Sequence, residues 1–595
     1  MSVLGLAQSL WLLVAALGLA LSVRYAGVPM LGQSAFVAVG GYGVALLGPG
    51  GAGLPLGIAA GLAVLLAAAG GCLTALGTAR LDAGYFALAT WTLAWLVQRA
   101  LIAFPDVFGG AEGLTRPAPA GLLSRTLGIR LTLTDRINLG MAAGTCLLVL
   151  AALYRLSLGP AGLDLAALRE SPELARSLGI PVAARRRAVL TATAALGGVA
   201  GAGSTVLLGV ISPVDVSPLL SLELLMAVLL GGALLGRTRL GRTRLGRTRA
   251  GGIRLGRTRL GGALGGAALW WGPVLGVGLL SVLPGGPLAL PWPAELAGAP
   301  WRAVLTALLL LAVIAALGGR SVAGPPARPW PPPTEQPSRP VKTGVRLDLA
   351  HASVSYPGVA ALDDVSLTVH GGQVHALVGP NGSGKSTLLE VLAGDLGAGT
   401  VRLDGVPLRA RSAPERVRAG VVRTSQRPIV LAELSPVQQV ALAARGGAAW
   451  PQAVLRQLLA TPRSRLQTAQ LRATAAGALT ALGLGHLADL DPARLTTGER
   501  QLLQVARAVA TGAPVLLFDE PAAGMSAAER GVLQRLLREL ADGGAAVLIV
   551  EHDLRLVAAV ADQVTVLDAG RVLATGEAAA VRADPAVRAA LFGPA

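Results

Sequence analysis

The first 320 residues carry long apolar runs separated by short polar segments. Each run is close to the roughly 20 residues that a helix needs to cross about 30 Å of hydrocarbon, and none shows the polar face of a soluble helix. The runs lie near residues 3–23, 27–48, 53–79, 83–104, 137–157, 188–212, 219–236, 262–284 and 298–319. The pattern predicts an all-α transmembrane domain with about nine spans over residues 1–322.

A proline-rich segment ends this pattern. Eight prolines occur in the 17 residues from Gly324 to Pro340, a composition typical of an extended, semi-rigid spacer. Residues 323–344 are therefore predicted to be a linker. Beyond it, short β-rich runs such as 361–369 and 373–378 alternate with helical stretches, which predicts an α/β domain over residues 345–595.

Composition and charge support a membrane protein. The chain is 53% hydrophobic and 14% charged, whereas soluble domains average about 25% charged residues, so a wholly soluble enzyme and a disordered chain are excluded. The net charge of +18 is concentrated in residues 1–320. Its arginines flank apolar runs or fall in a Leu-Gly-Arg-Thr-Arg repeat at 235–259, which favours contact with lipid headgroups over nucleic acid. For the repeat itself, a duplication tolerated in a cytoplasmic loop is the favoured interpretation, and contact with anionic lipid headgroups is the alternative.

A phosphate-binding loop begins the chemistry of the C-terminal half. The apolar run 374–378 leads into Gly-Pro-Asn-Gly-Ser-Gly-Lys-Ser-Thr at 379–387 and then into an apolar helix start. This strand, loop and helix order is the context that the GxxxxGK[ST] motif requires. We expect backbone N–H groups to surround phosphate oxygens, Lys385 to reach the β- and γ-phosphates, and Ser386 to bind Mg²⁺. The chain has only two lysines, Lys342 and Lys385, so a compact ammonium is singled out here.

Two carboxylates follow a second buried-type strand. Residues 515–518 are apolar and run directly into Asp519 and Glu520. Asp519 is suited to hold Mg²⁺, and Glu520 to polarise the water that attacks the γ-phosphate. Together the two motifs predict hydrolysis of ATP.

The C-terminal half resembles an ATP-binding cassette ATPase. The resemblance rests on five short elements in the family's order: an aromatic at Tyr356, the phosphate loop, a glutamine loop at 422–426, a signature at 495–499, and a switch histidine, His552. In the signature, Thr496 replaces the family's usual serine and keeps its hydroxyl group.

The N-terminal half resembles the permease of branched-chain amino acid uptake systems. The segments that carry this likeness are 32–36, 84–88, 109–114 and 272–276, together with a polar stretch at 167–180. The resemblance implies that 167–180 is the coupling element that docks on the ATPase. The sequence segments 519–525 and 590–593 are similar to those of the ATPase subunit of the same systems. The chain is thus expected to be a fused permease and ATPase.

The resemblance assigns roles to site residues. Catalysis is assigned to Glu520, His552 and Gln426. ATP binding is assigned to Tyr356, Gly379, Asn381, Gly382, Ser383, Gly384, Lys385, Ser386, Thr387, Thr496, Gly498 and Glu499. Mg²⁺ is assigned to Ser386, Gln426 and Asp519. Because the family sandwiches ATP between two cassettes, the expected partners are a second permease and a second ATPase, or a second copy of this chain. An extracytoplasmic substrate-binding protein is also expected.

Orientation follows from the arginines. The ATPase must meet cytosolic ATP, and counting membrane crossings back from it places the loop at 158–187 inside the cell. This loop contains five arginines, which agrees with the positive-inside rule. The expected location is the cytoplasmic membrane, with several spans and the ATPase in the cytoplasm. The expected cargo is a branched-chain or other hydrophobic amino acid. Urea or short amides remain an alternative cargo, and a membrane-tethered regulatory ATPase that moves no substrate is an alternative function.

Overall fold

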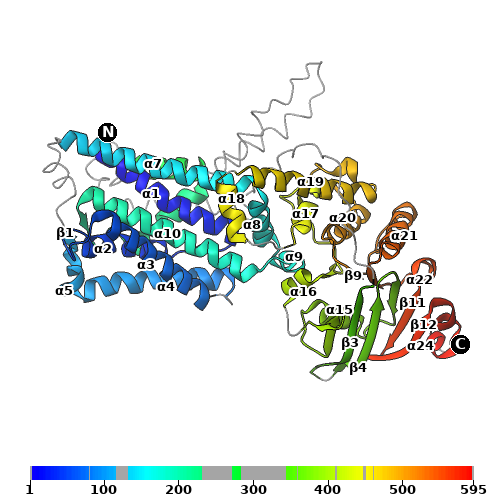
Figure 1. Cartoon of the computed structure of the whole chain (residues 1–595). Coiled ribbons are helices and arrows are strands. Elements are labelled where there is room, and N and C mark those ends of the chain that lie inside the picture. The colour runs from blue at the N-terminus through cyan, green and yellow to red at the C-terminus, as the bar shows by residue number, and fades with distance from the viewer. Residues whose placement is uncertain are drawn as a thin grey trace, which may run out of the picture. The chain divides into compact units, whose positions relative to one another are not determined.

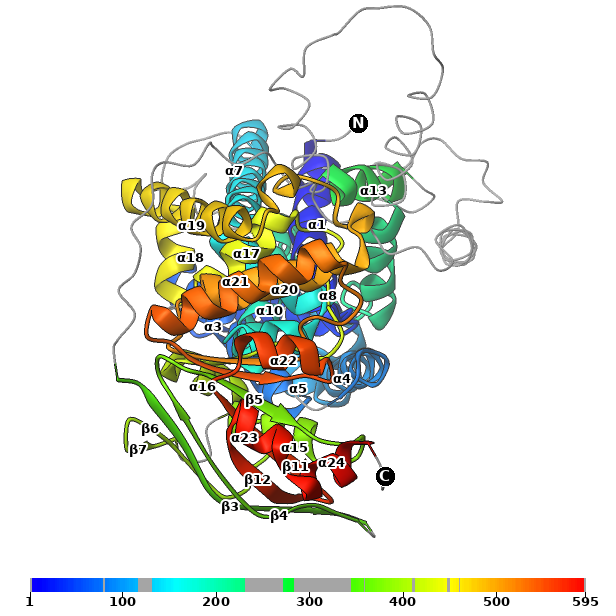
Figure 2. The same ribbon diagram turned by 90° about the vertical axis from the view of Figure 1, so that its right-hand side faces the viewer.

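The computed structural model has two compact units (Figures 1 and 2). The first contains residues 1–158 and 183–326, and the second contains 159–182 and 327–595. The described residues are 3–78, 81–115, 131–230, 271–282, 344–357, 359–408, 412–446, 450–459 and 461–592. The segment 159–182, which the sequence pattern places within the transmembrane domain, is grouped with the C-terminal unit.

Helices form the first unit. Among the described residues, five are long and apolar enough to cross a membrane: Leu4–Ala26, Leu56–Gly77, Ala83–Ala103, Arg136–Ser157 and Val182–Leu208. They correspond to α1 (Val3–Leu21, continued by a π-helical turn), α3 (Leu56–Gly77), α4 (Ala83–Ala103), α7 (Leu131–Leu158) and α10 (Val182–Leu208). Shorter apolar helices are α2 (Gln33–Leu47), Pro218–Leu230 and α13 (Trp271–Val282).

Five of the predicted spans therefore coincide with long helices, and the total of nine stays a prediction. The run at 27–48 coincides with α2, which is shorter than the predicted span. The run at 219–236 coincides with Pro218–Leu230 as far as residue 230, and residues 231–236 lie outside the described residues. The run at 298–319, the arginine repeat and residues 323–343 of the linker lie outside the described residues.

Small residues and one buried amide hold the helices of this unit together. Added Cβ atoms at Gly40 and Gly201 would overlap backbone atoms of α10 and α2 respectively, so the two backbones are in direct contact. The buried Gln33 side chain donates to the carbonyl oxygens of Ala15 (3.3 Å) and Thr193 (3.2 Å), linking α2 to α1 and α10. Exposed leucines on α3 and α7 give the unit the apolar outer surface of a lipid-facing bundle.

The second unit is built on two sheets. A six-stranded sheet has the order β12-β11-β5-β10-β9-β8, parallel except for β12, and a four-stranded antiparallel sheet has the order β4-β3-β6-β7. The bounds are β3 Arg346–Tyr356, β4 Val359–His370, β5 Val374–Val378, β6 Thr400–Leu403, β7 Val406–Pro407, β8 Val421–Arg423, β9 Val515–Asp519, β10 Ala546–Val550, β11 Gln563–Asp568 and β12 Arg571–Glu577. The α/β character expected after the linker is confirmed.

Helices cover these sheets and form a separate helical part (Figures 1 and 2). They are α15 Lys385–Ala393, α16 Ala413–Ala419, α17 Pro436–Ala444, α18 Trp450–Leu458, α19 Pro462–Ala481, α20 Thr497–Ala510, α21 Ala527–Asp542, α22 Leu554–Val560, α23 Ala578–Ala583 and α24 Pro585–Phe592. One apolar core lies between the antiparallel sheet, α15 and one face of the parallel sheet, and a second joins the other face to α17, α19, α20 and α21. The parallel strands are buried on both faces, which explains their continuous apolar sequences.

One buried histidine makes the stability of this unit depend on pH. His375 lies in β5, and its Nε2 is 2.8 Å from Thr565 Oγ1. Burial, and secondarily the charge of His370, lower the pKa of His375 from 6.5 to about 4. The unfolded chain therefore takes up a proton between these values and the folded chain does not, so the folded state loses stability as pH falls from 6.5 toward 4.

We expect this loss to reach about 3 kcal/mol, given about 1.4 kcal/mol per pKa unit. His375→Gln should remove the histidine's share, which chemical denaturation of the full chain in detergent at pH 5 and pH 7 measures. Carboxylates titrate in both proteins, so the difference between the two pH profiles is the quantity to compare. Identical profiles would contradict the assignment.

Candidate functional site

The phosphate loop joins the end of β5 to the start of α15. Gly384 has φ 99°, and a Cβ there would overlap the carbonyl oxygen of Ala361 in β4, so only glycine fits. A Cβ at Gly379 would overlap the carbonyl oxygen of Leu567, at the end of β11. Asn381, Gly382 and Ser386 are exposed along the loop, Thr387 is partly buried, and Ser383 is buried. The loop thus opens its backbone and hydroxyl groups to solvent at a helix N-terminus.

Lys385 folds back onto this loop. Its Nζ donates to the carbonyl oxygens of Gly379 (2.8 Å) and Pro380 (2.7 Å) and lies 3.4 Å from Ser383 Oγ. Burial lowers the pKa of Lys385, and the nearby Glu520 and Asp519 carboxylates oppose that shift. The ammonium therefore sits among hydrogen-bond acceptors at the place where the motif requires it to meet phosphate.

Asp519 ends β9 and is almost completely buried. Its Oδ2 accepts from Arg423 Nη2 at 3.0 Å. Burial raises the pKa of Asp519 more than the Arg423 charge lowers it. Its other oxygen, Oδ1, is buried without a hydrogen-bond partner in the described part of the chain. A buried carboxylate oxygen without a donor fits a hard cation.

Mg²⁺ at this place would have one protein carboxylate and depend on phosphate oxygens and water for the rest. No group of three His, Cys, Asp or Glu side chains suitable for a metal occurs among the described residues. That ligand set is the one Mg²⁺ adopts beside nucleotides. Asp519 and Ser386 fit this arrangement.

Glu520 is the meeting point of three predicted catalytic residues. Its Oε1 lies 2.9 Å from His552 Nε2 and 3.4 Å from Gln426 Nε2. Its backbone has φ 47°, an uncommon value for a residue with a Cβ. The Glu520 N–H donates to Val550 O at 2.9 Å, which holds this conformation. The strained turn after β9 directs the carboxylate toward the side chains that follow β8 and β10.

Further residues support this centre, and the sequence motifs do not reveal them. Gln501 Nε2 donates to the carbonyl oxygen of Glu520 (3.3 Å), and Gln504 Nε2 donates to the carbonyl oxygen of Ser425. Both glutamines lie on α20, so the helix that follows the signature is bonded to the glutamine loop and to the catalytic turn. Glu551 accepts from the N–H groups of Ala522 (2.9 Å) and His552 (3.1 Å). The only local signal for the glutamines is their i, i+3 spacing on one helix face.

The predicted signature residues lie at the N-terminus of α20. Thr496 is the N-cap, and its hydroxyl accepts from Glu499 N (3.2 Å), while the Glu499 carboxylate accepts from Thr496 N (2.8 Å). A Cβ at Gly498 would overlap the Glu529 carboxylate. No hydrogen bond of the described residues joins this capping box to the phosphate loop, and α20 and α15 lie in different parts of the unit (Figure 1). Within one chain these residues cannot complete the phosphate loop's site.

Tyr356 is the remaining predicted contact of the nucleotide. It ends β3, pairs with Val359 across the hairpin, and exposes 47% of its surface. The following strand reaches the phosphate loop at Ala361. The ring is therefore free to stack on a planar ligand close to that loop.

The segment 159–182 docks on the helical part of the second unit. It forms α8 (Pro160–Glu170) and α9 (Pro172–Ser177). An apolar cluster joins it to the residues around 431–443: Ala166, Ala167, Leu174, Ala175, Leu178, Ile180, Leu431, Leu434, Leu442 and Ala443. This apolar contact agrees with the expectation that the stretch 167–180 binds the ATPase.

Polar contacts fix the register of this docking. Asp164 Oδ1 lies 2.6 Å from Arg445 Nη1, and only 2% of each side chain is exposed. The same nitrogen donates to Pro160 O at 2.9 Å. Gln457 Oε1 accepts from Ala161 N (3.1 Å), at the start of α8. At the other end of α8, the Glu170 carboxylate accepts from the N–H of Ala432.

A cavity of about 820 Å³ lies between α9 and the glutamine loop. Glu173 and Arg176 line one side of it, and Thr424, Gln426 and Arg427 line the other. The loop that carries Gln426 therefore has open space on the side of the docking segment. A displacement of the loop can reach the docking segment without breaking a packed core.

Comparison with known proteins assigns both halves. Residues 1–314 match the family described as branched-chain amino acid transport system, permease component, and residues 362–523 match the ABC transporter family. Similar curated proteins are the arabinose import ATP-binding protein AraG 2 of Burkholderia ambifaria (38% identity; 40% of this chain, 43% of the relative) and its ribose import ATP-binding protein RbsA 2 (33%; 41% and 46%). The hemin import ATP-binding protein HmuV of Nocardia farcinica is 38% identical over 38% of this chain and 74% of its own length.

The chain spans less than half the length of the first two of these relatives. Among solved structures, a nucleotide-free ATP-binding cassette from an ABC transporter is 28% identical, covers 42% of this chain and 100% of its own, and has a TM-score of 0.37.

Proposed function

Because the chain belongs to the branched-chain amino acid transport permease family and carries an ABC transporter cassette in the same polypeptide, we propose that it is an ATP-driven importer of branched-chain or other hydrophobic amino acids. The cassette makes it an ATP-hydrolysing transporter component. The observation that carries the proposal is the contact of Glu520 with His552 and Gln426. These three residues belong to the second unit, which also contains the segment 159–182. In the chain, that segment connects α7 to α10.

The catalytic roles follow from this geometry. Glu520 orients the attacking water and accepts its proton, His552 holds the carboxylate in place, and Lys385 binds the β- and γ-phosphates. Mg²⁺, when bound by Ser386, Gln426 and Asp519, neutralises charge on the phosphate oxygens. Thr496 and Gly498 are assigned to the γ-phosphate of the nucleotide on a partner cassette, because they lie at the start of α20, in a different part of the unit from α15 and its phosphate loop (Figure 1). A second copy of this chain or a second ATPase is the proposed partner that completes each site.

Coupling runs through the docking segment. Binding of ATP closes two cassettes, the glutamine loop moves toward the cavity beside α9, and the segment passes this movement to α7 and α10, between which it lies in the chain. Such a cycle requires two states with different affinities for cargo and nucleotide. The cytoplasmic membrane is the proposed location, with the cassette inside, because the arginines of 158–187 favour that side. A second permease and an extracytoplasmic binding protein are the proposed further partners.

The cargo proposal rests on the permease half. The cassette relatives are named for import of arabinose, ribose and hemin at 33–38% identity, so likeness of the cassette does not distinguish cargo. The family of residues 1–314 is described by branched-chain amino acid transport. For this reason an amino acid is favoured over a sugar, and urea or short amides remain the competing cargo.

The test is uptake by proteoliposomes that contain the full chain, with ATP on the cassette side and a branched-chain amino acid binding protein on the other. We expect labelled leucine to accumulate and labelled arabinose to stay outside. Accumulation of urea in place of leucine, with a urea-binding protein, would overturn the cargo. Hydrolysis of ATP without accumulation of any of the three would favour a regulatory ATPase.

A further inference from the structure

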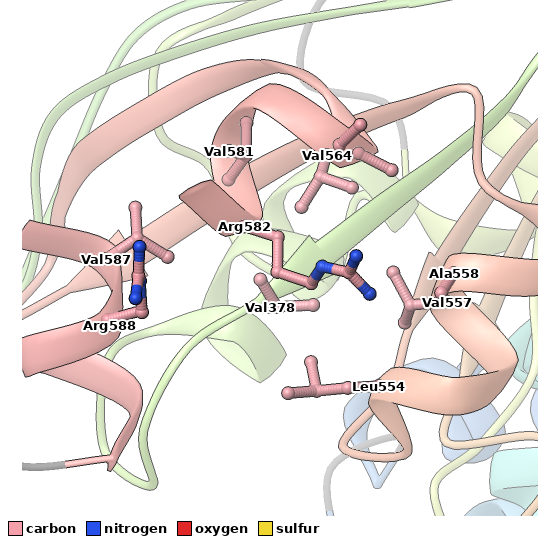
Figure 3. Close-up of a pocket in the computed structure, with 11 residues that line it drawn as sticks. Val378, Leu554, Val557, Ala558, Val564, Val581, Arg582, Val587 and Arg588 are labelled. Atoms are coloured by element: carbon pink, nitrogen blue, oxygen red, sulfur yellow. The ribbon is translucent and has the colours of Figure 1, made fainter. Parts of the chain in front are cut away.

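A small apolar pocket lies among the C-terminal elements of the second unit, and none of the proposed nucleotide-binding or catalytic residues lines it (Figure 3). Its volume is about 160 Å³. Val378, Val557, Val564, Val581 and Val587 form its floor, and each is at most 6% exposed. A cavity of about 150 Å³ accommodates benzene in another protein, so the pocket has room for an aliphatic group of about five carbon atoms.

Two arginines give the pocket a positive rim. In Figure 3 the Arg582 side chain extends from α23 toward α22, and its guanidinium lies beside Val557. The exposed Arg582 side chain makes no hydrogen bond or ion pair within the described part of the chain. Arg588, on α24, donates one bond to Ala583 O (3.1 Å) and keeps its other donors. None of the described lining residues is acidic. Asp584, two residues after Arg582, accepts from Ala586 N at the start of α24.

Free guanidinium groups above an aliphatic floor select one class of ligand. Guanidinium binds carboxylate through two parallel, charge-assisted hydrogen bonds. A neutral ligand would lack this charge assistance, and a cationic ligand would be repelled. We propose that this pocket binds a small aliphatic carboxylate, with its hydrocarbon chain on the valine floor and its carboxylate on Arg582.

The position of the pocket connects such a ligand to ATP hydrolysis. Val378 is the last residue of β5 and directly precedes Gly379 of the phosphate loop. Leu554, on the opposite wall, begins α22 two residues after His552. The ligand therefore contacts the strand that carries the phosphate loop and the helix that follows the switch histidine. By linkage, a ligand that binds the states with and without nucleotide unequally changes nucleotide affinity and the rate of hydrolysis.

The test of this site measures the binding of 3-methylbutanoate to the full chain in detergent by ligand-observed NMR. We expect a Kd on the order of 1 mM, given the seven non-hydrogen atoms of the ligand. The neutral 3-methylbutanamide and the cationic 3-methylbutylamine have nearly the same shape, and we expect both to bind at least about fivefold more weakly, as the loss of a charge-assisted bond of about 1 kcal/mol or more implies.

Two variants and one control complete the test. Arg582→Gln should weaken carboxylate binding about fivefold or more, and Ala558→Leu, which fills the pocket from an exposed helix position, should abolish it. Arg535→Gln, an exposed arginine on α21 outside the pocket, should bind like the unmodified chain. The proposal is overturned if the amide binds as tightly as the carboxylate, or if Arg582→Gln binds normally. An ATPase rate unaffected by saturating 3-methylbutanoate would overturn the link to hydrolysis.

Discussion

Glu520→Gln is expected to lower ATP hydrolysis by roughly 10²–10⁴-fold, the usual contribution of a positioned general base. The amide keeps the shape of the side chain and can still accept a hydrogen bond from His552, whose Nε2 is 2.9 Å from the carboxylate. It cannot take a proton from water. ATP binding should persist, because the phosphate loop and Lys385 are unchanged, and uptake should stop.

A matched control carries the same chemical change elsewhere. Glu539→Gln alters an exposed carboxylate on α21, and we expect normal hydrolysis and uptake from it. Phosphate release by purified protein and binding of a fluorescent ATP analogue separate loss of chemistry from loss of binding. Ordinary turnover in Glu520→Gln would remove Glu520 from its assigned role.

Asp164→Asn is expected to uncouple hydrolysis from uptake. Asp164 and Arg445 form a buried ion pair with 2% exposure on each side. Removing one partner of such a pair leaves an uncompensated charge, which typically costs about 3–5 kcal/mol. Docking of α8 on the second unit should weaken by more than about 100-fold. The catalytic centre lies on other elements, so ATP hydrolysis should persist while the number of leucine molecules moved per ATP falls at least about tenfold.

The charge-swapped double variant, Asp164→Arg with Arg445→Asp, provides the sharper comparison. It should recover part of the coupling that each single variant loses, because the attraction returns with opposite polarity. Arg169→Gln, which removes a more exposed ion pair with Glu433 at the edge of the same contact, should have a smaller effect. A normal ratio of uptake to hydrolysis in Asp164→Asn would show that this pair does not transmit movement.

The parts that follow local rules could be predicted from sequence. The phosphate loop lies between β5 and α15 as its motif requires, and Asp519 and Glu520 end a strand that its apolar run predicts. The sequence assigns Glu520 to the site by its place after that strand, but it does not predict the left-handed backbone of this residue. Hydrogen bonds with Val550 and Gln501 hold that backbone, and neither residue is a neighbour in the sequence. Strain of this kind depends on neighbours far away in sequence.

Contacts over long sequence separation account for most of what the sequence did not reveal. Asp164 and Arg445 are 281 positions apart, and neither belongs to a motif. Arg423, which donates to Asp519, lies within the glutamine loop, but the motif assigns a role only to Gln426. The hydropathy pattern also overestimates the length of α2, because apolar turns next to a helix have the same composition as the helix itself.

The internal bonds of Lys385 bear on how the site empties. When phosphate leaves, the ammonium has acceptors 2.7 and 2.8 Å away in Pro380 and Gly379. When the nucleotide leaves, the Lys385 ammonium therefore replaces its phosphate partners with these two carbonyl oxygens. It is not left buried without a hydrogen-bond acceptor. The same carbonyl oxygens compete with the phosphates of incoming ATP for the Lys385 ammonium. This competition lowers the affinity for ATP and favours rapid nucleotide exchange.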